Sequence, residues 1–187
     1  MRESLMKTQN EVPFNNFTGF LRGDGIDSPE ELGGDCVVQA RHLAGGLSER
    51  GYGVKYVVAT ENKHVAVVAN DEGRLFYLDP CIYQDEPSSL SEAFRKATTS
   101  IVSARPVVKG LPSRVSVFGT SSSAFYVSAS SEMKREDGGS LYCSFWQSGF
   151  DLSEVLDEPP APYVFKEKSS PSTFLLRVLD GKGAALE

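Results

Sequence analysis

Three residues of types that can perform nucleophilic chemistry together stand at Cys36, His64 and Asp79. A cysteine reacts as its thiolate, and a helix N-terminus or a nearby imidazolium lowers the pKa of a thiol. In "LGGDCVVQARHLAGG", Cys36 follows two glycines and opens an apolar helical pattern. Backbone N–H groups at such a helix start could also hold a developing oxyanion. Cys36 is therefore the candidate nucleophile, and the alternative is a buried structural thiol.

The chain has two histidines that could serve as the base. His42 follows Cys36 by six residues on the same predicted helix, so it points about 120° away and cannot reach the thiol. His64 opens a predicted strand, and Asp79 ends the next one. We therefore expect His42 to be an exposed or packing residue and His64 to be the partner of Cys36.

The hairpin that joins these strands allows a prediction of register. If the turn-forming segment "NDEG" (70–73) pairs Ala69 with Arg74, then His64 lies directly opposite Asp79. Residues directly opposite on one face have Cβ atoms about 4.5–5.5 Å apart. The Asp79 carboxylate could then hold the imidazole in one tautomer, as in a catalytic triad.

The remaining elements predict an α+β fold. The first 25 or so residues read as irregular, and "DSPEEL" has a capping-box pattern at Ser28 and Glu31. A second helix runs from Cys36 to Leu47, and glycines end it. The hydrophobic period then changes to that of strands. We expect one short helix at 89–97, and strands at 54–60, 64–69, 74–79, 113–119, 123–129, 140–146 and 173–179. We predict a helical segment over 1–52 and an antiparallel β-rich sheet or barrel over 53–187, together one compact catalytic domain.

Composition narrows the function. The chain has 187 residues and a net charge of −6, and it lacks a run of Lys and Arg that would bind nucleic acid. No apolar run reaches the roughly 18 residues of a membrane span, and the N-terminus does not resemble a signal peptide, so we expect a cytoplasmic protein. Three widely spaced cysteines suggest neither a disulfide framework nor a metal site.

The segments "GDCVVQARHLAGGLSERGYGVKYVVAT" and "HVAVVANDEGRLFYLDP" resemble the transglutaminase-like superfamily, in which a cysteine at a helix start is followed by a histidine and an aspartate on neighbouring strands. Within it, "EVPFNNFTG", "LGGDC" and "YVFKEKSSPSTFL" are similar to the arylamine N-acetyltransferases. The resemblance implies that Cys36 is the acylated nucleophile, His64 its base and Asp79 the residue that orients the base.

This sequence departs from the acetyltransferase pattern at several positions. Leu32 stands where those enzymes have arginine, and Val38 and Ala40 stand where they have glutamate and asparagine. The stretch "DPCIY" replaces their Asp-Val-Gly-Phe-Gly, and the chain is shorter than is typical of them.

The resemblance implies an acyltransferase with no tightly bound cofactor, whose co-substrate is an acyl-CoA or acyl-carrier thioester and whose acceptor is a small-molecule amine. The cofactor-binding residues are unknown. Tyr83, Phe125, Phe145 and Trp146 are candidates for an apolar acceptor pocket, although plain core packing is the favoured explanation of each. The same triad would serve a transglutaminase-like peptidase or amidase, and a non-catalytic relative could retain it as packing.

Overall fold

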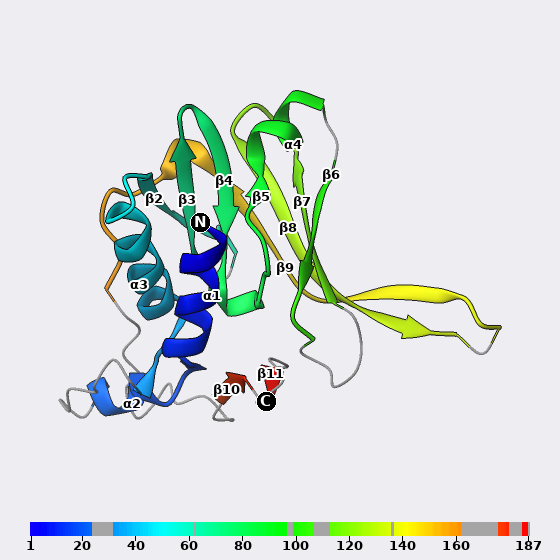
Figure 1. The fold of residues 1–187 in the computed structure, drawn as a ribbon, viewed down its shortest axis with the longest axis horizontal. Coiled ribbons are helices and arrows are strands. Elements are labelled where there is room, and N and C mark those ends of the chain that lie inside the picture. Colours follow the sequence, from blue (N-terminus) through cyan, green and yellow to red (C-terminus); the bar gives the residue numbers. More distant parts are fainter. Residues whose placement is uncertain are drawn as a thin grey trace.

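The computed structural model describes residues 1–23, 32–61, 63–96, 99–106, 113–135, 137–161, 176–179 and 185–186. Helices α1 (Arg2–Glu11) and α3 (Cys36–Ser48) lie on one side of a four-stranded antiparallel sheet. On its other side lie a second four-stranded sheet and the short helix α4 (Leu90–Lys96) (Figure 1). A further helix, α2, spans Thr18–Gly23. The α+β class is therefore confirmed.

The first sheet has the order β2-β3-β4-β5 and carries the site. Its strands are β2 (Gly53–Val58), β3 (Val65–Asp71), β4 (Arg74–Leu78) and β5 (Ser88–Ser89). The strand β3 is covered on both faces. Val65 and Val67 pack with the apolar side of α3, whereas Ala66 and Val68 pack toward the second sheet. This double burial explains the continuous apolar run in "HVAVVA".

The second sheet has the order β6-β7-β8-β9. Its strands are β6 (Thr99–Ala104), β7 (Ser113–Gly119), β8 (Ala124–Lys134) and β9 (Ser140–Asp151). The ends of β8 and β9 extend past the rest of the sheet as a two-stranded arm (Figure 1). Among the described strands neither sheet closes on itself, so the sheet rather than the barrel of the prediction is found.

A small third sheet joins the two ends of the chain. It has the order β1-β10-β11, with β1 at Phe14–Asn15, β10 at Leu176–Leu179 and β11 at Ala185–Leu186. Two 3₁₀ turns, η2 (Pro80–Ile82) and η3 (Leu152–Glu154), follow β4 and β9.

The N-terminal prediction was wrong in one respect. The first residues form α1 and α2 rather than an irregular segment. In α1, Ser4, Leu5, Thr8 and Gln9 recur at helical spacing and are buried. Polar members of this stripe hid the pattern from a search for apolar residues. The predicted helix start at 27–31 lies outside the described residues, as does the segment 163–175.

The predicted helix at Cys36 and the three strands that follow it are confirmed. The second sheet differs from the prediction in two ways: β6 was not predicted, and β8 and β9 are longer than predicted. Among the described residues, no helix has the length and apolarity that a membrane crossing would require.

Candidate active site

Cys36 is the first residue of α3 and is 5% exposed. The loop before it is held by a close backbone contact, because Gly34 N donates to Pro13 O at 3.0 Å. Gly33 has a φ of +74°, and a Cβ added there would lie 1.8 Å from Pro13 O. Only glycine fits this position. The glycine pair thus fixes where α3 begins and where the thiol lies.

The N-cap of α3 changes one expectation for the site. The Asp35 carboxylate accepts hydrogen bonds from Val37 N at 3.0 Å and from Val38 N at 3.1 Å. These two amides are therefore committed to the cap and do not bind an oxyanion while it is in place. Arg22 lies 3.5 Å from Asp35 and offsets the charge of the cap.

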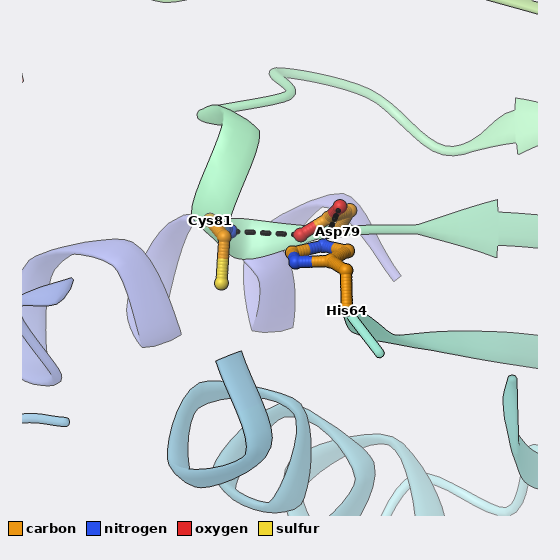
Figure 2. A group of neighbouring side chains, drawn as sticks. All are labelled: His64, Asp79 and Cys81. Carbon is orange, nitrogen blue, oxygen red and sulfur yellow. Dashed lines mark hydrogen bonds and ion pairs between the residues drawn. The ribbon is translucent and has the colours of Figure 1, made fainter. Parts of the chain in front are cut away.

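The Asp79 carboxylate, which is fully buried, lies beside His64. The His64 Nε2 to Asp79 Oδ2 distance is 2.7 Å. The Tyr77 hydroxyl donates to the same oxygen at 2.9 Å, and Cys81 N donates to Oδ1 at 2.9 Å (Figure 2). Asp79 N in turn donates to the Gln84 side-chain oxygen at 3.0 Å. Residues before and after Asp79 in the sequence therefore hold this residue in one orientation.

The predicted hairpin register was wrong, although the predicted contact is present. The ladder pairs Asp71 with Arg74 and Ala69 with Phe76, because the turn has only two residues, Glu72 and Gly73. Both have positive φ, +51° and +85°, as in the tight turns that connect hairpins. The register is shifted by two residues from the prediction.

A shift of two residues keeps the same faces together. His64 and Asp79 are therefore diagonal neighbours just beyond the last paired residues, rather than directly opposite. Diagonal positions are still within reach of long side chains, which is why the imidazole meets the carboxylate at 2.7 Å.

The charges around His64 favour its protonated form. Burial acts to lower the pKa of His64, whose side chain is only 12% exposed. The charge of Asp79, its hydrogen bond, and the hydrogen bond and charge of Cys36 outweigh burial and raise this pKa to about 10. Burial, followed by the Asp79 charge, raises the pKa of Tyr77 well above its usual value, so the phenol stays protonated and donates to Asp79. At neutral pH the site holds an imidazolium between the Asp79 carboxylate and the Cys36 sulfur.

Sequence reasoning missed Cys81. This residue lies in η2, is buried, and belongs to the group His64, Asp79 and Cys81, whose potential ligand atoms all lie within 4.8 Å of one another. The sequence feature that could have identified Cys81 is its position, two residues after Asp79 at the end of the same predicted strand. Wide spacing to the other cysteines concealed that α3 and η2 meet in one apolar cluster.

The second sheet contributes Trp146 to the surroundings of His64. Its ring meets the His64 ring edge-on, with centroids 4.9 Å apart. On β9, Trp146 pairs with Ala129 and Ser144 pairs with Ser130, so Phe145 is an extra residue in a β-bulge. The bulge turns Trp146 toward the imidazole and leaves Phe145 41% exposed.

The four candidates for an acceptor pocket therefore separate. Tyr83 and Phe125 are fully buried core residues, and Phe125 stacks on Phe150 at 5.3 Å. Phe145 and Trp146 line an open hollow of about 400 Å³ with Ser144 and Gln147. Of the four, Trp146 has a ring contact with a site residue, His64.

A larger hollow of about 530 Å³ lies between α1 and α3, on the side of α3 that faces away from the sheet. None of Cys36, His64 and Asp79 lines it. His42 does, and its Nδ1 lies 3.0 Å from Thr8 Oγ1. The prediction that His42 points away from Cys36 is confirmed.

The fold and the site together define a class: an α+β protein with a cysteine at a helix start and a histidine and an aspartate at the ends of neighbouring strands. No family model and no curated protein sequence matches the chain. Among solved structures, it is similar to arylamine N-acetyltransferase C from Bacillus anthracis, with a TM-score of 0.56 and 14% identity over 99% of this chain and 77% of that one. The predicted resemblance to the arylamine N-acetyltransferase fold is confirmed.

Proposed function

We propose that the protein is an acyltransferase that moves an acyl group from a thioester to an amine through Cys36. One observation carries the proposal: a buried His64 imidazole lies between the Asp79 carboxylate and the Cys36 thiol. This is the order of groups that activates a nucleophile in catalytic triads. The likeness to a solved N-acetyltransferase supports the same reading.

The first half-reaction forms an acyl-enzyme. At the start of the reaction His64 already holds the proton, as an imidazolium beside the Cys36 thiolate, and the thiolate attacks the thioester carbonyl. The C–S bond of the donor breaks, and the leaving thiol takes the proton from His64, so that acyl-Cys36 and free CoA or carrier thiol result. Asp79 keeps the imidazole in the required tautomer throughout.

The second half-reaction passes the acyl group to an amine. The amine attacks the Cys36 thioester, its proton moves to His64, the C–S bond to Cys36 breaks, and the amide leaves a Cys36 thiolate beside the His64 imidazolium. We place the acceptor beside Trp146, because this residue both lines the hollow on β9 and contacts His64.

Intact-protein mass spectrometry tests the first step. After exposure to acetyl-CoA and to longer acyl-CoA thioesters, we expect one acyl adduct per chain, mapped to Cys36. Cys36→Ala should lose the adduct, and Cys143→Ala is the matched control that should keep it, since Cys143 lies on the arm of the second sheet. An adduct on another cysteine, or none with any thioester, would refute the assignment.

Product analysis with a panel of amines tests the second step. Amide formation that rises with amine concentration supports transfer. Acyl loss at one rate whatever amine is present would instead indicate that water is the acceptor, as in a transglutaminase-like peptidase or amidase.

A further inference from the structure

Cys81 is a second thiol at the site, and acyl transfer gives it no role. It is buried, its backbone N–H holds Asp79, and its sulfur lies within 4.8 Å of potential ligand atoms of both His64 and Asp79. Figure 2 shows that the His64 nitrogen not bonded to Asp79 faces the side on which Cys81 lies. Among the acetyltransferase-like motifs, "DPCIY" is one of the stretches that differ, so this thiol is a feature of this chain.

Cys36 brings a second sulfur to the same imidazole. It is hydrogen-bonded to His64 from the start of α3, and it shares an apolar cluster with Cys81 of η2. Two sulfurs thus lie near one imidazole: Cys81 belongs to the group within 4.8 Å, and Cys36, which lies outside that group, reaches the ring through its hydrogen bond. A Cys₂His set is one that zinc uses when it keeps a fourth position for water.

The spacing suits the metal. Zinc binds sulfur at about 2.3 Å and imidazole nitrogen at about 2.0–2.1 Å, so a tetrahedral site holds the two ligand atoms about 3.6 Å apart. Because the ligand atoms of Cys81 and His64 lie within 4.8 Å of each other, a contraction of at most about 1.2 Å brings them to this separation. Side-chain rotation at the end of a strand can supply that movement.

Asp79 is better placed as a support than as a ligand. Its two oxygens already accept from His64, the Tyr77 hydroxyl and Cys81 N. An imidazole that binds a metal through one nitrogen commonly donates its other N–H to a carboxylate, which fixes the ring. The Nε2 to Oδ2 bond of 2.7 Å provides this arrangement and leaves Nδ1 for the metal.

We propose that Cys36, Cys81 and His64 form a zinc site, with Asp79 orienting the imidazole. Each thiol releases its proton to solvent as its Zn–S bond forms, and the imidazolium releases its Nδ1 proton as the Zn–N bond forms. The metal occupies the thiolate and the imidazole that acyl transfer requires, so the zinc-loaded protein lacks a free nucleophile. Zinc would therefore be a reversible inhibitor. The site stands on ligand geometry and is independent of the proposed acyl transfer.

Metal titration of the full chain tests the site without any substrate. With Cd²⁺ as the probe, we expect one ion per chain and a thiolate-to-metal charge-transfer band with the intensity of two thiolates. Cys81→Ser should lose about half of the band and weaken binding by at least ~10-fold, the lower end of the range for disturbing a metal site. Cys143→Ser is the matched control and should bind as the wild type does. Equal affinity of Cys81→Ser and wild type would overturn the proposal.

A second measurement needs no variant, which covers the case in which Cys81→Ser fails to fold. One equivalent of Zn²⁺ should slow alkylation of Cys36 and Cys81, mapped by peptide, and leave the rate at Cys143 unchanged. Equal protection of all three thiols, or of none, would also overturn the site. Neither readout depends on acylation, so a chain that binds zinc but never acylates would refute only the proposed function.

Discussion

The two four-stranded sheets differ in how they are covered and in the kind of polar group that they bury. The first, β2 to β5, lies between helices and the second sheet, so five consecutive residues of β3 are buried. The second, β6 to β9, is covered on part of one face, and the outer half of β9 is largely exposed. The ionisable side chains of the candidate active site lie at the covered end of the first sheet. The buried polar pairs of the second sheet are hydroxyls, such as those of Ser113 and Ser131, whose Oγ atoms lie 2.9 Å apart.

The difference shows what a buried charge requires. Taking a carboxylate out of water is costly unless it is paired and hydrogen-bonded. Asp79 meets this condition through His64, Tyr77 and Cys81, all of which come from the same hairpin or the turn after it. The second sheet supplies one neighbour, Trp146. We expect chemistry to depend strongly on the first sheet and weakly on the second.

The largest expected effect is that of Asp79→Asn. Loss of the carboxylate charge removes the main support of the protonated imidazole and permits the wrong tautomer, so acylation of Cys36 should fall by about 10²–10³-fold. The alkylation profile of Cys36 should also move to higher pH. Stopped-flow acylation and iodoacetamide rates measure the two effects.

Asp71→Asn is the control for this change, because Asp71 lies on the same hairpin but pairs with the exposed Arg74 at 2.6 Å. It should leave both measurements unchanged. Wild-type acylation in Asp79→Asn would show that this aspartate only ends a strand and would break the comparison between the sheets.

An intermediate effect concerns stability and pH. The pKa of His64 is about 10 in the folded protein, against 6.5 when unfolded. A raised pKa contributes stability that is fully present below about pH 6.5 and is lost as the pH rises through about 10. Each pKa unit is worth about 1.4 kcal/mol, so this contribution is at most about 5 kcal/mol.

Urea unfolding at several pH values between 6 and 10.5 measures this contribution. His64→Gln is the reference, because it retains every other titrating group, and its free energy of unfolding should fall less over this range. Parallel curves for the two proteins would mean that the site does not hold an imidazolium.

The smallest expected effect belongs to the second sheet. Trp146→Ala removes the edge-on contact with His64, and aromatic pairs of this kind are worth about 0.5–1.5 kcal/mol, so acylation should slow by about 2- to 10-fold. Phe145→Ala, one residue earlier on the bulge, should change the acylation rate less than twofold. If the Trp146 variant loses as much activity as Asp79→Asn, the second sheet is an equal partner in the site.

Much of the site could be predicted because its signals are local. The glycines before Cys36 and the apolar stripe after it fix the helix start, and the change of period after Gly53 fixes the strands. The contact of His64 with Asp79 survived an error in register because the error was two residues, which preserves the face. The fold class follows from the same pattern.

What could not be predicted depends on tertiary contacts. The bulge at Phe145 inverts the alternation along β9, and nothing in "SLYCSFW" marks which residue is extra. The approach of Cys81 to His64 depends on how α3 packs against η2. The cap at Asp35 was visible as a residue, but its use of the Val37 and Val38 amides was not.

The placement of the site along the chain has a consequence for the order of folding. Cys36, His64, Asp79 and Gln84 fall within one uninterrupted stretch that forms α3, β2, β3 and β4. Contacts between residues close in sequence close small loops, which cost little entropy and form fast, whereas distant pairings form late. We expect this stretch to assemble first and β9 to dock afterwards, so that Trp146 covers a nucleophile that already has its base.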